Sequence, residues 1–140
     1  MSDELDSFLK ELQDQIYDET LRDYGRKAFD RWIDPSHMHP MENPDAHGRI
    51  TGSCGDTMEI FLRFKDGRVS EASFTTDGCG PSMICGSLAA ELALGKEPEE
   101  IERITAETIL ETIGGLPEED QHCASLAANT LQVALHDYLD

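Results

Sequence analysis

Three of the four cysteines lie where one predicted secondary structure element gives way to another. Cys54 precedes the alternating run TMEIFLRFK, Cys79 lies where a strand pattern changes to a helix pattern, and Cys123 opens the last helical stretch. Asp56 and His122 lie beside two of them in the sequence. Thiolates bind soft metals and attack other sulfur atoms. Such junctions can gather at one end of a domain, so these residues are candidates for a metal site or a sulfur-transfer site.

The local sequence favours the reactive form of two of these thiols. Cys79 and Cys123 lie next to predicted helix N-termini, where unsatisfied N–H groups and the helix dipole favour a thiolate over a thiol. Gly55, Gly78 and Gly80 leave room around the sulfurs for a bulky inorganic ligand. No Cys-x-x-Cys is present, so a zinc ribbon or a thioredoxin-type dithiol lacks its usual motif.

The first third of the chain predicts helices followed by a loop. Residues 3–17 carry leucines and an isoleucine at helical spacing, and residues 21–32 form a second helical stretch that ends before Pro35. Residues 34–48 hold three prolines and three histidines without periodicity, which predicts a loop. We expect those histidines to be solvated rather than bound to metal.

The middle of the chain predicts an antiparallel sheet. Residues 57–65 alternate between apolar and polar side chains, and Asp66-Gly67 separates them from a second strand over residues 68–75. An Asp-Gly pair between two such runs is a strong hairpin signal. A bulge near Ser70 would correct the phase of the second strand. With a short strand at residues 48–53, the sheet has three strands.

Helical patterns fill the rest of the chain. One helix follows Cys79 and ends near Gly95, one or two short helices span residues 98–113, and a final helix spans residues 123–139. Strands followed by helices predict the α+β class, with a small three-stranded antiparallel sheet and helices packed on one face.

Charge narrows the range of partners. The chain has 29 acidic and 11 basic residues and a formal net charge of −18. This charge argues against binding nucleic acid or anionic membranes and favours basic partners. The sequence has no apolar run long enough to span a bilayer and no secretory signal pattern at its N-terminus. We therefore expect a cytoplasmic protein with reduced thiols.

Together, the three cysteine motifs resemble the IscU/NifU-type iron–sulfur cluster assembly scaffolds, including the NifU N-terminal domain. The resemblance rests on Cys54-Gly55-Asp56, Gly78-Cys79-Gly80 and His122-Cys123 in this order, with Asn43-Pro44 upstream. It covers residues 17–140. It implies one domain over residues 1–140 with a SufE/NifU-like fold. The extended N-terminal helix expected over residues 1–20 is longer than is usual in the family and is a departure from its pattern.

The resemblance also implies a function and a ligand set. A [2Fe–2S] cluster would be assembled from iron and from sulfur supplied by a cysteine desulfurase, and then passed to apo iron–sulfur proteins. Cys54, Cys79 and Cys123 would be the thiolate ligands and sulfur acceptors, and Asp56 or His122 would take the fourth position. Stable clusters usually have four thiolates, so three thiolates with a weaker donor suit a carrier. A homodimer is a further expectation.

Two further features depart from the family pattern. Many members carry Leu-Pro-Pro-Val-Lys before the His-Cys pair, as a contact for a dedicated Hsp70-type chaperone. Here the segment reads Leu116-Pro117-Glu118-Glu119-Asp120, so we do not expect that contact. Cys85 replaces a small residue, and six positions after Cys79 it points to another face of the helix. We expect Cys85 to be a buried apolar residue.

Two other functions fit some of the same residues. The first is a zinc-binding persulfide acceptor of the SufU type, a sulfurtransferase, because Zn²⁺ accepts Cys, His and Asp in a tetrahedral set. Acceptors of that type carry an insertion between the second and third cysteine motifs and lack this histidine, so the compact segment between Cys79 and Cys123 and the presence of His122 make the sequence more similar to the scaffolds. The second is a thiol–disulfide enzyme that uses Cys79 and Cys85, which has no motif to support it.

Overall fold

One antiparallel sheet organises the molecule. The computed structural model describes residues 7–12, 36–52, 55–78 and 80–139. Strands β1 (Ala46–Thr51), β2 (Thr57–Lys65) and β3 (Arg68–Thr76) pair in the order β1–β2–β3. This confirms the predicted three-stranded sheet.

The hairpin between β2 and β3 forms as the sequence predicts. Asp66 and Gly67 have φ angles of 54° and 80°, and two positive φ angles are typical of the type I′ turn that matches strand twist. The register shifts between Arg63 and Phe64, which leaves Ser70 as an extra residue in β3. The Ser70 hydroxyl donates to the Arg63 carbonyl oxygen at 3.0 Å. The predicted bulge is therefore confirmed.

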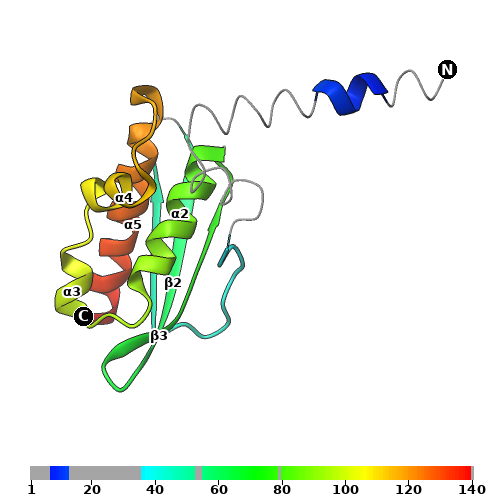
Figure 1. The fold of residues 1–140 in the computed structure, drawn as a ribbon. Coiled ribbons are helices and arrows are strands. Elements are labelled where there is room, and N and C mark those ends of the chain that lie inside the picture. The colour runs from blue at the N-terminus through cyan, green and yellow to red at the C-terminus, as the bar shows by residue number, and fades with distance from the viewer. Residues whose placement is uncertain (1–6, 13–35, 53–54, 79, 140) are drawn as a thin grey trace.

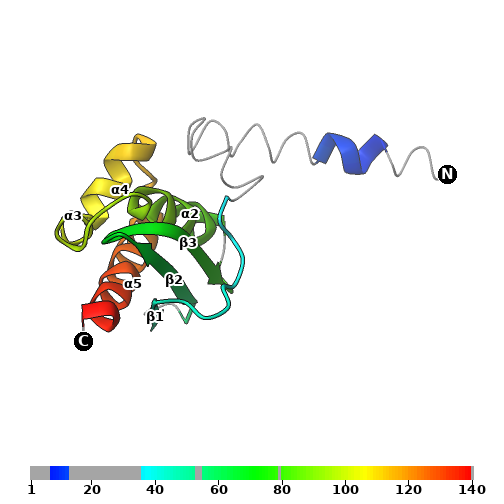
Figure 2. The ribbon, with the colours of Figure 1, turned by 90° about the horizontal axis from the view of Figure 1, so that it is seen from below.

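The helices cover one face of the sheet. They are α2 (Gly80–Ala93), α3 (Pro98–Glu102), α4 (Ala106–Ile113), the 3₁₀ turn η1 (Glu118–Asp120) and α5 (Gln121–Leu139). Figures 1 and 2 both place α2 and α5 on the same face, with α5 against β1 and α2 against β3. The turn η1 was not predicted.

Alternation along β2 places the core between these two layers. Met58, Ile60 and Leu62 are fully buried, and side chains from α2 and α5 meet them. Burial of each such side chain stabilises the fold by about 1.5–3 kcal/mol. Gly48 lets α5 approach closely, since a Cβ there would lie 2.4 Å from the Thr130 carbonyl oxygen.

The predicted loop over residues 34–48 ends earlier than expected, because β1 begins at Ala46. The strand was hard to predict there since its inward residues are small: Ala46 is buried, and Gly48 faces the backbone of α5. The predicted helix over residues 21–32 lies outside the described residues.

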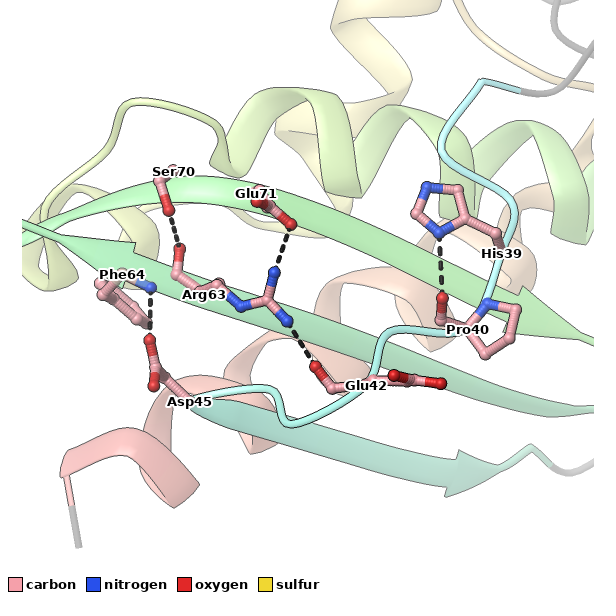
Figure 3. Close-up of polar contacts among 8 residues, drawn as sticks. All are labelled: His39, Pro40, Glu42, Asp45, Arg63, Phe64, Ser70 and Glu71. Carbon is pink, nitrogen blue, oxygen red and sulfur yellow. Dashed lines mark hydrogen bonds and ion pairs between the residues drawn. The ribbon is translucent and has the colours of Figure 1, made fainter.

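The segment 36–45 crosses the outer face of the sheet from the β3 edge to the start of β1 (Figure 3). At the β3 edge, the Phe74 N–H donates to the His37 carbonyl oxygen at 2.9 Å. The Arg63 guanidinium then joins the segment to the sheet, donating to the Glu42 carbonyl oxygen and to the Glu71 carboxylate. The segment therefore crosses part of the sheet face opposite the helices.

The N-terminal part is described only over residues 7–12, which are helical. Phe8, Leu9 and Leu12 are exposed there. None of the helices in the described part of the chain is both long and apolar enough to cross a membrane.

Candidate functional site

Four chain segments meet at one end of the domain, which we call the site end. Here β2 begins, β3 ends, and α2 and α5 begin, while the β2–β3 turn lies at the opposite end (Figure 1). Asp77 ties the strand ends together, because its Oδ1 accepts from the Thr57 N–H at 2.7 Å. The Thr76 hydroxyl donates to the Thr57 carbonyl oxygen at 2.8 Å.

The turn before β2 reaches the same end. The Gly52 N–H donates to the Asp56 carbonyl oxygen at 2.8 Å, and Gly55 has a φ of 91°, a conformation that favours glycine. A Cβ on Gly52 would lie 3.6 Å from the Leu126 side chain, one turn into α5. Gly52 therefore lies against the first turns of the last helix.

Cys123 is the described thiol at the centre of this region. It is the third residue of α5 and has 0% of its surface exposed. The buried Ser82 hydroxyl of α2 donates to Cys123 Sγ at 3.5 Å. His122 Nε2 lies 3.6 Å from the same sulfur. The predicted His122–Cys123 pair is thus in contact.

The backbone sets the tautomer of His122. Its Nδ1 lies 3.0 Å from the Glu119 carbonyl oxygen, and a carbonyl can only accept, so Nδ1 carries the proton. In the neutral ring, Nε2 then holds the lone pair. This is the arrangement in which a histidine binds metal through one nitrogen while the other is held by a hydrogen bond.

Asp56 lies across from α2. A Cβ on Gly78 would come within 2.9 Å of Asp56 Oδ2 and 2.7 Å of Ser82 Oγ. Glycine at position 78 therefore lets the carboxylate and the hydroxyl lie close to the chain just before Cys79. The sequence predicted that Gly78 leaves room around the sulfurs for an inorganic ligand, and this stays a prediction, because Cys79 lies outside the described residues and the described neighbours of Gly78 are Asp56 and Ser82.

Cys54 and Cys79 lie outside the described residues, so the predicted meeting of three sulfurs stays a prediction. In the described part of the chain, no group of three or more His, Cys, Asp and Glu side chains is arranged to hold a metal ion. Of the five predicted site residues, the structure brings His122 and Cys123 together and places Asp56 at the same end of the sheet.

The other sequence candidates lie elsewhere. Cys85 is fully buried in the core, as predicted. His47 is in β1 rather than in a loop, stacked on Phe61 with its Nε2 3.0 Å from Glu59 Oε1. His39 and His136 are exposed. None of these side chains joins the site.

The depression on the outer face of the sheet is separate from the thiol. It has a volume of about 360 Å³ and is lined by Arg49, Thr57, Glu59, Thr75, Thr76 and Asp77. Cys123 belongs instead to the core on the helix side of the sheet.

Sequence reasoning missed Ser82. A serine three residues after a candidate ligand cysteine, in the first turn of a helix, was the available signal. Its importance depends on the contact with Cys123, which is 41 residues away in the chain.

The fold and the motifs define a family. The model described as NifU-like N terminal domain matches residues 23–140. The chain belongs to this family.

Individual relatives agree with this assignment. An iron–sulfur cluster assembly scaffold protein IscU of Archaeoglobus fulgidus is 38% identical over 116 residues, which cover 82% of this chain and 76% of that protein. Among solved structures, a NifU-like protein (N-terminal) from Brucella abortus has a TM-score of 0.66 at 16% identity, covering 85% of this chain and 96% of that one. A scaffold protein for the SUF system from Fervidobacterium islandicum has a TM-score of 0.64 at 20% identity, covering 83% and 98%. These two structures show the shared fold.

Proposed function

We propose that this chain is a scaffold on which an iron–sulfur cluster is assembled and from which the cluster is transferred to apo-proteins. The observation that carries the proposal is the buried Cys123 thiol at the start of α5, with a histidine nitrogen 3.6 Å from its sulfur. Membership of the NifU-like family and 38% identity to a scaffold protein support it. The cluster is cargo in this scheme rather than a resident cofactor.

The proposed ligands are the thiolates of Cys54, Cys79 and Cys123, with Asp56 or His122 in the fourth position. The case for Cys54 and Cys79 rests on their sequence motifs. Their described neighbours support it, since Gly52 lies against α5 and Gly78 lies beside Asp56. Three thiolates and one weaker donor make a [2Fe–2S] site that can release its cargo, whereas stable clusters usually have four thiolates.

Two donors compete for the fourth position. His122 Nε2 can bind iron while Nδ1 stays bonded to the Glu119 carbonyl oxygen. Asp56 offers carboxylate oxygens from the facing loop. Dissociation of the bound donor, before the other takes its place, would open a coordination position for a recipient protein without breaking a thiolate bond.

The proposed partners are a cysteine desulfurase, which supplies sulfur, and apo iron–sulfur proteins, which receive the cluster. The net charge of −18 favours basic docking surfaces and salt-sensitive association. A homodimer and a cytoplasmic location stay predictions of the sequence. The acidic Glu118–Asp120 turn does not suit the contact with a dedicated Hsp70-type chaperone.

The test is reconstitution without oxygen, using ferrous iron, cysteine and a cysteine desulfurase. We expect a brown protein whose Mössbauer spectrum shows a [2Fe–2S] cluster, and loss of that cluster in Cys123→Ser. Cys85→Ala is the matched control, because Cys85 is buried in the core, and it should keep the cluster. Colourless wild-type protein, or a Cys123→Ser variant with the full cluster, would contradict the scaffold.

A zinc-binding persulfide acceptor is the second candidate. The His122 tautomer favours zinc as well as iron, because Zn²⁺ accepts imidazole nitrogen and thiolate sulfur in a tetrahedral set. Metal analysis of protein purified without oxygen separates the two functions. Iron with inorganic sulfide supports the scaffold, and one zinc per chain without sulfide supports the sulfur acceptor.

A further inference from the structure

Ser82 is a fully buried polar residue in the first turn of α2. Its hydroxyl donates to Cys123 Sγ at 3.5 Å, a contact that joins the starts of α2 and α5. A buried hydroxyl without a partner destabilises a fold by about 1–3 kcal/mol. The serine therefore depends on that sulfur for its hydrogen bond among the described residues.

Buried or half-buried hydroxyls in the helices take one of two courses: Ser87 of α2 also points out of its helix, to Ser36 Oγ at 2.9 Å, whereas two threonines bond within their own helices. Thr130 donates to the Leu126 carbonyl oxygen at 2.7 Å, and Thr112 donates to the Thr108 carbonyl oxygen at 2.7 Å. Such bonds, four residues back along the same helix, are the usual solution for Ser and Thr inside helices. Ser82 instead directs its hydroxyl across to another helix. The position thus favours contact with the sulfur over a local bond.

The acceptor strength of that sulfur depends on its state. A neutral thiol accepts weakly, whereas a thiolate accepts strongly because hydrogen bonds to ionised groups are the stronger class. A donor fixed against Cys123 Sγ therefore contributes most when the sulfur is anionic, as it is when it binds metal. Hydrogen bonds to ligand sulfurs are among the factors that set the reduction potential of a cluster.

We propose that Ser82 is a positioning residue whose hydroxyl holds the Cys123 sulfur and withdraws electron density from it while the sulfur binds the cluster. This inference rests on the proposed function, since it takes Cys123 to be a ligand. The hydrogen bond weakens electron donation from sulfur to iron. It therefore makes the cluster easier to reduce and the Fe–S(Cys123) bond easier to break on transfer.

The test compares Ser82→Ala with Ser82→Thr, both reconstituted with iron and sulfide. In Ser82→Ala the iron–cysteine stretching bands in the resonance Raman spectrum should move to higher frequency, and the midpoint potential should become more negative. Ser82→Thr keeps a hydroxyl and should return both quantities toward wild type. Thr130→Val is the matched control: it removes a buried hydroxyl that bonds only within α5, and it should change neither quantity.

The outcomes separate this inference from the scaffold proposal. If wild type binds a cluster, Cys123→Ser loses it and Ser82→Ala matches wild type in both quantities, the scaffold stands and the role of Ser82 is wrong. If Ser82→Ala folds but does not load while Ser82→Thr loads, the role of Ser82 is supported. If neither variant loads although circular dichroism shows both folded, packing explains the effect and the inference is overturned. Wild type that binds no cluster overturns the scaffold proposal.

Discussion

The helices that begin at the site end and the helices that lie away from it start differently. α3 and α4 carry glutamates in their first turns, and each begins with a capping box made by its own side chains. α2 and α5 carry no acidic residue in their first turns, in a chain with 29 acidic residues. The nearest acidic residues in the sequence lie just outside these helices: Asp77 is three residues before α2, and Glu118–Asp120 form the turn η1 directly before α5.

This difference shows what each helix start is used for. A carboxylate in the first turn neutralises the positive end of the helix dipole and stabilises the helix by about 0.3–1 kcal/mol. α3 and α4 gain that stabilisation locally. α2 and α5 carry no such charge inside their first turns, and the described groups at their starts include the Cys123 sulfur and the Asp56 carboxylate. The starts of α3 and α4 are therefore stabilised by their own side chains, whereas the starts of α2 and α5 favour an anionic sulfur.

The largest expected loss of stability comes from a substitution that forces α5 away from β1. Gly48→Ala would place a Cβ 2.4 Å from the Thr130 carbonyl oxygen and 2.6 Å from the Ala134 nitrogen. Both are backbone atoms, so β1 and α5 must separate. We expect the free energy of unfolding in urea to fall by about 3 kcal/mol, with loss of cluster loading.

Gly52→Ala is the control for this prediction, because its Cβ meets side-chain atoms at 3.6 Å, and its stability should stay close to wild type. Equal stabilities of the two variants would contradict close packing of α5 on β1.

A smaller loss of stability should follow from removing the side-chain cap at the start of α4. The Thr105 side chain accepts from the Thr108 N–H at 3.3 Å. Thr105→Ala should lower the free energy of unfolding by about 1 kcal/mol, the usual cost of losing a threonine cap. Cluster loading should not change, because α4 does not begin at the site end. Thr105→Ser keeps the hydroxyl and should stay near wild type. A cluster-loading defect in Thr105→Ala would contradict the inference that the start of α4 serves stability and not the site.

The smallest expected effect is on metal affinity, and it should follow from placing a carboxylate in the first turn of α2. Pro81 is a half-buried residue in the first turn of α2. Pro81→Glu should weaken the binding of cobalt(II), measured by its thiolate absorption, by roughly twofold to fivefold relative to Pro81→Gln, since a first-turn charge is worth about 0.3–1 kcal/mol. The glutamine variant controls for loss of the proline ring. Equal cobalt affinities would show that the helix start does not influence the thiolates.

Local patterns in the sequence predicted most of the fold. The alternation over residues 57–65, the Asp66-Gly67 turn and the bulge at Ser70 were all predicted correctly, because each depends on residues close together in the chain. The start of β1 was predicted too late. Ala46 and Gly48 give no strand signal by themselves. Small residues occupy these positions because α5 packs directly against β1.

The candidate site likewise has features that the sequence determines and features that depend on the folded structure. The sequence by itself determined the residue types, namely the cysteine motifs, the adjacent His122 and the glycines that leave room, because these follow from chemistry and from neighbours in the chain. Only the tertiary structure decided that the Ser82 hydroxyl meets Cys123 Sγ. The Glu119 carbonyl that fixes the His122 tautomer is only three residues away, and the local backbone conformation places it there. Both contacts depend on how separate segments pack or on the path of the backbone into α5. A one-dimensional pattern does not encode distances between side chains that packing alone brings together.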